Sequence, residues 1–154
     1  MSDPTILERI QSDMAAAMKA READKLSTLR MLKTALMEAK TKKPKDATLT
    51  TDEEIEILQR YVKKRREVID EMRKAGRNDV IASEEREIAV TQVYLPQGVS
   101  EGELRKLVRE AIAKTGAAGP KDMGKVIGAV MAQVKGRAEG SAVSKLVKES
   151  LAQG

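Results

Sequence analysis

The residue types that most often do chemistry in enzymes are absent from this sequence. It has no cysteine and no histidine, which excludes thiol nucleophiles, thiolate metal sites, the commonest general base and the commonest zinc ligand. Carboxylates remain, and the densest group is Glu84, Glu85 and Glu87. Only Glu84 and Glu87 share a face on a helix, so we expect salt bridging rather than metal binding or acid catalysis. The arginines that would neutralise them are Arg65, Arg77 and Arg86.

A glycine-rich stretch matches part of a phosphate-binding loop. Residues 119–125 read GPKDMGK, which fits most of the pattern G-x-x-x-x-G-K-[ST]. Val126 stands where a hydroxyl would hold magnesium, no apolar strand precedes the loop, and Pro120 removes a backbone N–H. We therefore predict a helix start here, with Gly124 and Gly128 allowing another backbone to come close. The sequence predicts no catalytic residue, no metal site and no cofactor.

The remaining candidates for a functional site are the positively charged side chains of Lys and Arg. The run KKRR (residues 63–66) would surround a helix rather than line one face, and nearby carboxylates at helical spacing favour an ion-paired surface over a binding site. The C-terminal part is different, because residues 98–154 hold ten basic and six acidic side chains, against 19 and 18 in residues 1–97. This asymmetry favours a polyanionic partner, and the alternative is that the charge only keeps a small domain soluble.

The kind of polyanion follows from the aromatic residues. The only aromatic side chains are Tyr61 and Tyr94, and readers of single strands stack bases on aromatic rings. A folded RNA is instead recognised by shape and phosphate contacts, which need Lys, Arg and helix N-termini. We therefore expect a folded RNA, and we expect neither DNA nor a membrane as partner.

These cations must be positioned by helices. With no Phe or Trp, 34% charged residues and no alternating segment, the chain is predicted to be all-α, with a core of Leu, Ile, Val, Met and Ala. We expect an N-terminal helical domain over residues 1–96, of about four helices, and a three-helix tail domain over residues 97–154. No stretch approaches the ~20 apolar residues of a membrane span, and the N-terminus does not read as a secretion signal, so we expect a cytoplasmic protein.

The expected helix ends rest on capping residues, glycine and proline. The first helix should begin at Ser2–Pro4 and run to about Lys19, and the second should span about Leu26 to Lys40. A capping box from Thr51 to Glu54 should open a long third helix that stops at Gly76. The fourth should be capped by Asn78 or Asp79 and end before Pro96. Arg65 falls on the apolar seam of the third helix, so it should reach a carboxylate or mark where a partner helix ends.

The tail reads as three shorter helices. Ser100 and Glu103 form a second capping box, GAAGPKD turns the chain, and two apolar stripes follow on either side of the Lys135–Arg137 loop. Each stripe must be buried against a neighbouring helix, which leaves the basic residues in water. At about 55 residues the tail folds alone only marginally.

Motifs in the tail carry a family resemblance. The segments DMGKVIGAVM (122–131), GRAEG (136–140) and VSKLVKESL (143–151) resemble the tail domain of GatB, the tRNA-recognising subunit of glutamyl-tRNA/aspartyl-tRNA amidotransferase. The resemblance implies that the tail contacts tRNA. The residues that it implies as tRNA-facing are Lys121, Lys125, Lys135, Gly136, Arg137 and Lys145.

The upstream segments extend the resemblance to nearly the whole chain. It is similar to the stand-alone YqeY family through DKLSTLRMLK (24–33), VKKRRE (62–67), AGRND (75–79) and VYLP (93–96). The amidotransferase label of the family is expected to be an association only, because the kinase-like and glutaminase parts of that reaction have no candidate here.

Three hypotheses of function result. The first is a non-catalytic accessory protein that docks on tRNA, or on a tRNA-charging or amidating enzyme, through its basic tail. The alternative is a protein-interaction module whose N-terminal amphipathic helices present an apolar groove. An amidotransferase with glutamine as amide donor is the least favoured.

Overall fold

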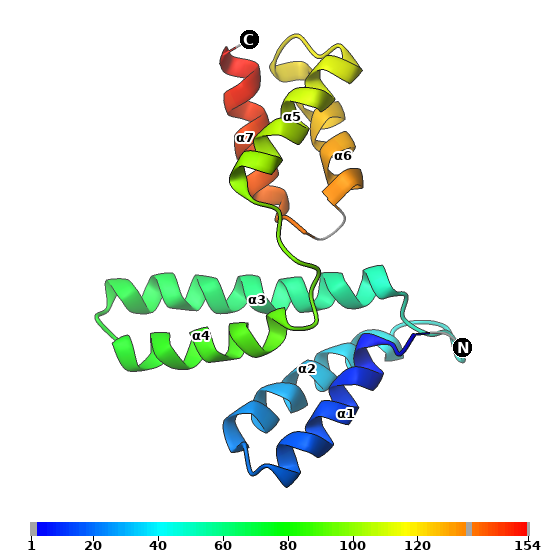
Figure 1. Ribbon diagram of the computed structural model, residues 1–154, viewed down its shortest axis with the longest axis vertical. Coiled ribbons are helices and arrows are strands. Elements are labelled where there is room, and N and C mark those ends of the chain that lie inside the picture. The colour runs from blue at the N-terminus through cyan, green and yellow to red at the C-terminus, as the bar shows by residue number, and fades with distance from the viewer. Residues whose placement is uncertain (1–2, 135–136, 154) are drawn as a thin grey trace. The chain divides into compact units, whose positions relative to one another are not determined.

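The computed structural model describes residues 3–134 and 137–153, and within them the chain is all-α, as predicted (Figure 1). No strand occurs in this described part. Its elements are α1 (Ile6–Lys19), α2 (Ala23–Thr41), α3 (Thr51–Lys74), α4 (Asn78–Gln92), α5 (Glu101–Thr115), the short 3-10 helix η1 (Pro120–Asp122), α6 (Met123–Val134) and α7 (Gly140–Gln153). The chain divides into two compact units, unit 1 over Met1–Leu95 and unit 2 over Pro96–Gly154.

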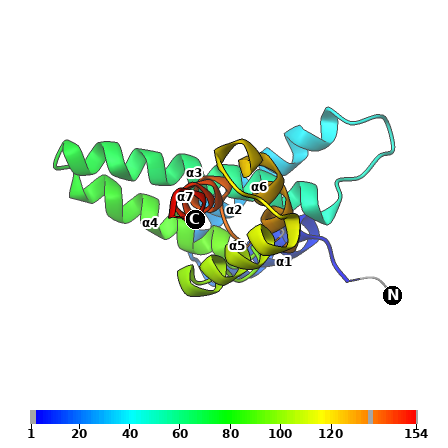
Figure 2. The ribbon, with the colours of Figure 1, turned by 90° about the horizontal axis from the view of Figure 1, so that it is seen from above.

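Unit 1 consists of two helical hairpins. Helix α1 pairs with α2, and α3 lies alongside α4 in both views (Figures 1 and 2), while α2 also packs on α3 and α4. The side chains at the centre are fully buried, and they are Ile10, Leu29, Leu32, Leu36 and Leu58. Burial of each such side chain contributes about 1.5–3 kcal/mol, so this aliphatic cluster stabilises the packing of the two hairpins.

The start of α1 differs from the prediction. Helix α1 begins at Ile6, and the hydroxyl of Thr5 accepts the N–H of Glu8 at 3.1 Å as its N-cap. The predicted start at Ser2–Pro4 was too early, because Thr5 offers a capping hydroxyl that Pro4 lacks; Ser2 itself lies outside the described residues. The predicted end at Lys19 is confirmed.

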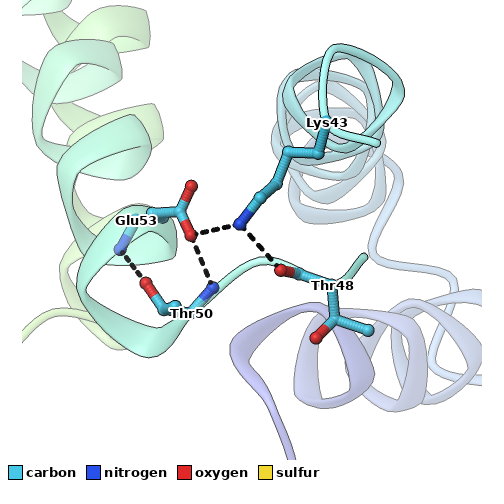
Figure 3. Close-up of polar contacts among 4 residues, drawn as sticks. All are labelled: Lys43, Thr48, Thr50 and Glu53. Carbon is cyan, nitrogen blue, oxygen red and sulfur yellow. Dashed lines mark hydrogen bonds and ion pairs between the residues drawn. The ribbon is translucent and has the colours of Figure 1, made fainter. Parts of the chain in front are cut away.

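The capping box of α3 lies one residue earlier than predicted (Figure 3). The hydroxyl of Thr50 accepts the N–H of Glu53 at 3.1 Å, and the N–H of Thr50 donates to Oε1 of Glu53 at 3.0 Å. Lys43 donates to the same Oε1 at 2.6 Å and to the carbonyl of Thr48 at 2.9 Å. The hydrogen bonds from Lys43 and from the Thr50 N–H lower the pKa of Glu53 to about 2. The loop before α3 is thereby tied to the first turn of the helix.

Glu54 caps a different helix from the one predicted. Its side chain is buried, and it accepts the N–H of Ile6 at 3.3 Å and the N–H of Leu7 at 2.9 Å. The first N–H groups of a helix have no partner within the helix and favour a negative charge, so a carboxylate from α3 satisfies them. The start of α1 is therefore fixed by α3, through residues 47 and 48 positions apart in the sequence.

The ends of α3 and α4 confirm one prediction and correct another. Gly76 has a φ of 71°, a left-handed conformation that costs glycine little, and it ends α3 as predicted. Neither Asn78 nor Asp79 caps α4. Its N-cap is Arg77, which makes no side-chain capping bond. Arg77 Nε instead donates to Oδ1 of Asp79 in the first turn at 3.3 Å, so the residue at the N-cap position pairs with one of the two expected caps.

Tyr94 closes the end of α4 on α1. Its ring is buried, its hydroxyl donates to Asp13, and the guanidinium carbon of Arg9 lies 5.1 Å from the ring centroid. Burial, followed by the hydrogen bond to Asp13, raises the pKa of Tyr94. These contacts anchor the segment that follows α4 to helix α1.

Unit 2 is a three-helix arrangement with its own core. Helices α5, α6 and α7 all contact one another, around valines that are fully buried, namely Val108, Val126, Val130, Val134, Val143 and Val147. Ser100 caps α5 as predicted, since its hydroxyl accepts the N–H of Glu103 at 3.1 Å, and Gly116 ends α5 with a φ of 70°. The predicted close approach at Gly124 and Gly128 is wrong, because a Cβ added at either would meet no atom within 4 Å.

Candidate nucleic-acid interface

Four of the six expected tRNA-facing residues lie in the described part of unit 2, and all four are exposed. Lys121 belongs to η1, Lys125 to the first turn of α6, and Lys145 to α7, while Arg137 stands in the connection between α6 and α7. Lys135 and Gly136 lie outside the described residues.

The structure divides these cations between the two ends of unit 2. Arg137 lies 3.9 Å from a carboxylate oxygen of Glu103 in the first turn of α5, and Lys145 acts electrostatically on Glu101 in the same turn. Lys125 instead lies at the start of α6, whose 12 residues extend about 18 Å before the chain reaches Arg137. A single ligand that touches both groups must therefore be long, as a nucleic-acid backbone is.

Arg137 also has a structural role. Its Nε donates to the carbonyl of Gln97 at 3.1 Å, and its own carbonyl accepts the N–H of Val99 at 3.0 Å. These bonds join the segment before α5 to the connection between α6 and α7. With 41% of its side chain exposed, Arg137 keeps part of its guanidinium in contact with water.

Helix α5 carries further exposed cations that the sequence reasoning did not single out. Arg105, Lys106 and Arg109 are exposed, and Arg109 stands four residues after Arg105 and three after Lys106, on the outer side of the helix. Arg105 is paired with Glu101 at 2.8 Å, and this hydrogen bond, with a smaller contribution from Lys145, lowers the pKa of Glu101. The spacing of cations along the predicted helix was the signal that could have found this row.

The carboxylates Glu84 and Glu87 form a partly buried ion-paired cluster in unit 1. Arg65 of α3 lies 3.6 Å from Glu84 and 3.7 Å from Glu87, and the Tyr61 hydroxyl donates to Glu87 at 3.3 Å. The prediction that Arg65 reaches a carboxylate is confirmed. Burial, followed by the hydrogen bond and charge of Glu87, raises the pKa of Glu84, while burial and Glu87 raise the pKa of Tyr61 to about 12.

This cluster joins two helices and holds no metal-binding set. Arg65 on α3 pairs with both carboxylates on α4, and its guanidinium carbon lies 4.9 Å from the ring centroid of Tyr61. Among residues 3–134 and 137–153 there is no group of three or more acidic side chains arranged to hold a metal ion. Nor does any helix in those ranges have the length and apolar character to cross a membrane.

Comparisons with known proteins agree with the family suggested by the motifs. A mitochondrial protein of Pyrenophora tritici-repentis, described as altered inheritance of mitochondria protein 41, is 34% identical over 149 residues, covering 94% of this chain and 80% of that protein. An uncharacterized protein of Schizosaccharomyces pombe is 32% identical over 99 residues, covering 63% of this chain and 77% of its own length. The model of the Yqey-like protein family matches residues 7–151. Because that match spans nearly the whole chain, this protein belongs to the YqeY-like family.

Proposed function

We propose that this protein is a non-catalytic accessory protein that binds tRNA, or docks on an enzyme carrying tRNA, through the cations of unit 2. The observation that carries the proposal is the exposure of these cations on a unit of strong positive charge. Residues 98–154 hold ten basic and six acidic side chains, and Lys121, Lys125 and Lys145 are all exposed. Phosphates are the ligands that such a surface attracts.

The arrangement favours contacts to a backbone over reading of bases. The cations lie on helices α5 to α7 and on η1, at both ends of α6, and the two tyrosines belong to unit 1, where they pack against Arg9 and Arg65. A surface with lysines and arginines but no free ring supports recognition by shape and phosphate position. We therefore propose a double-helical part of tRNA as the contacted region, with micromolar or weaker affinity.

The first test is binding of the purified protein to total tRNA, measured by fluorescence anisotropy at low salt. The variant Lys121→Glu/Lys125→Glu/Lys145→Glu reverses three exposed charges that make no hydrogen bond or ion pair within the described residues. We expect its affinity to fall at least tenfold, because each lost phosphate contact also becomes a repulsion.

The matched control reverses three exposed lysines of unit 1. Lys63→Glu/Lys64→Glu/Lys74→Glu changes the net charge by the same amount on α3. We expect it to weaken binding much less, through the long-range field alone. Equal loss in both variants, or loss only in the control, would remove unit 2 as the binding surface.

The proposal assigns no amide transfer to this chain. The chain has no cysteine to serve as a thiol nucleophile and no histidine to serve as a general base. Glutaminase turnover by the purified chain alone would overturn this part of the proposal.

We propose that the protein resides in the cytoplasm. Fluorescence microscopy of a tagged chain tests this compartment. A mitochondrial signal would contradict it, and mitochondria are the compartment in the name of the Pyrenophora relative.

A further inference from the structure

A groove runs along the face of α2 that is turned away from the core of unit 1. It is shallow and open, with a volume of about 520 Å³, and it is lined by six residues of α2 together with Met14 of α1. The α2 residues are Arg30, Lys33, Thr34, Met37, Glu38 and Thr41. Nothing in the proposed role of unit 2 uses this groove.

The spacing of the lining residues gives the groove its length. Steps of three or four residues link position 30 to 33 and 34, position 34 to 37 and 38, and position 38 to 41, so these positions form one continuous face over about three turns. Twelve residues of helix extend about 18 Å, which is the length over which a second helix presents anchors at positions i, i+3, i+4 and i+7. An elongated open groove of this length fits a helix better than a compact small molecule.

The apolar part of the groove is made of methionine. Met37 is 39% exposed, and Met18 and Met31 on the same α1–α2 hairpin are 59% and 46% exposed. These are three of the four large apolar side chains recorded as exposed in the described part of the chain. Of the methionines, Met14 and Met37 line the groove itself, and methionine is flexible enough to adapt to the apolar face of another helix.

The positive charge around the groove favours a partner with negative charge. Arg30 and Lys33 line it, and within the described residues neither makes an ion pair. Lys40 stands seven residues after Lys33 and is exposed beside the same face. The segment 30–45 holds six cations against Glu38 alone, and of these Lys43 is already held by Glu53. A partner with carboxylates beside its apolar row would therefore be complementary.

We propose that this groove docks an acidic amphipathic helix of a partner protein. The apolar row of that helix lies on Met14 and Met37, and its carboxylates reach Arg30, Lys33 and Lys40. The apolar side chains of Met14 and Met37 distinguish the groove from a phosphate-binding surface, because methionine does not bind phosphate. The proposal does not depend on tRNA binding, because its residues all belong to unit 1.

The test uses synthetic peptides and the full chain. Three helix-forming peptides of about 18 residues carry leucine at positions i, i+3, i+4 and i+7 in different registers, flanked by glutamate; matched peptides carry lysine in place of glutamate. The chain is labelled at its methionine methyl groups, which provide eight reporters for NMR. We expect an acidic peptide to shift the signals of Met14 and Met37 with micromolar to submillimolar affinity, and the lysine peptides to leave them in place.

Two exposed methionines of α2 make a matched pair of variants. Met37 lines the groove and Met31 does not, although the two are exposed to similar degrees. We expect Met37→Gln to weaken peptide binding about tenfold and Met31→Gln to change it less than about twofold. Arg30→Glu should weaken binding at least as strongly as Met37→Gln, whereas Lys25→Glu, an exposed reversal outside the groove, should not.

Four results would overturn the proposal. The first is that no acidic peptide shifts the signals of Met14 or Met37 at concentrations up to about 1 mM, which corresponds to a binding free energy of about 4 kcal/mol. The second is that Met37→Gln and Met31→Gln weaken peptide binding equally, and the third is that the chain forms a dimer that Met37→Gln dissociates. The fourth is that Arg30→Glu abolishes tRNA binding while Met37→Gln leaves tRNA binding unchanged. The third would assign the groove to a second copy of this chain, and the fourth would assign it to nucleic acid.

Discussion

Two adjacent glutamates at the start of α3 show how much depends on a single position. Glu53 completes the capping box of its own helix, whereas Glu54 is buried and accepts two N–H groups of α1. The sequence offers both Thr50 with Glu53 and Thr51 with Glu54 as capping boxes. The choice is made by tertiary structure, because only the register with Glu53 outside lets Glu54 reach the unpaired backbone groups of α1.

Substitution of Glu54 tests this assignment. Glu54→Ala leaves two N–H groups of α1 without their acceptor, so we expect the free energy of unfolding to fall by about 1–3 kcal/mol in urea denaturation. Glu56→Ala is the control, because Glu56 is exposed in a surface pair with Arg60 and its loss should cost less than about 1 kcal/mol. Equal losses in the two variants would contradict the cap.

The carboxylate of Glu84 gives a prediction about pH. Its pKa is raised above the ordinary 4.5 by burial and by Glu87, so the folded state binds a proton that the unfolded state has already released. The Glu84 contribution to stability is therefore full below pH 4.5 and declines as the pH rises through the raised pKa. We expect Glu84→Gln to raise the free energy of unfolding at neutral pH and to remove this decline, measured by urea denaturation from pH 4 to 8.

Glu53 provides the opposite case as a control. Its pKa is lowered to about 2, so its contribution is present above 4.5 and is lost as the pH falls toward 2. Glu53→Gln should therefore lower the free energy of unfolding at neutral pH and should bring it closer to that of the wild type at low pH. A stabilising Glu53→Gln, or a destabilising Glu84→Gln at neutral pH, would contradict the assigned causes of the two shifts.

At the scale of the elements, sequence periodicity and stop residues predict this fold well. The stop of α3 at Gly76 and the cap of α5 at Ser100 follow from local chemistry, since a left-handed glycine and a capping hydroxyl act within their own helix. What a helix face touches does not follow from local chemistry. The spacing of Gly124 and Gly128 suggested a close backbone, yet both positions are open.

The open glycines of α6 lead to a stabilising substitution. Gly124→Ala and Gly128→Ala each add a methyl group without a clash and restrict the unfolded chain, so we expect each to raise the free energy of unfolding by about 0.5–1 kcal/mol. Gly116→Ala is the contrasting variant, because its φ of 70° strains any residue with a Cβ. Thermal denaturation followed by circular dichroism measures the relative stabilities of the three variants. A destabilised Gly124→Ala would contradict the open space found around Gly124.

A substitution of Arg137, in the connection between α6 and α7, can distinguish a role in stability from a role in tRNA binding. Arg137→Lys keeps the positive charge but loses the planar donor that holds the carbonyl of Gln97. We expect a loss of about 0.5–1.5 kcal/mol in the free energy of unfolding and faster hydrogen exchange at residues 97–99, with little change in tRNA affinity. A large loss of tRNA affinity with unchanged exchange would instead make Arg137 a direct ligand of the RNA.

At the scale of the molecule, the sequence reveals the charge asymmetry but not its arrangement. Counting residues places the positive charge in the tail, and the resemblance suggests which cations face tRNA. Only the fold distributes them over both ends of α6. Likewise, the amphipathic N-terminal helices were evident, whereas the groove on α2 depends on Met14 from another helix.

The central claim, that unit 2 binds tRNA through phosphate contacts, is tested most directly by the salt dependence of binding to total tRNA. We expect log affinity to fall linearly with log salt, with a slope of about −3 to −4 for roughly four neutralised phosphates. We also expect the slope to be reduced by about one for each of Lys121→Gln, Lys125→Gln and Lys145→Gln. An affinity independent of salt, or a slope that these three substitutions leave unchanged, would contradict it.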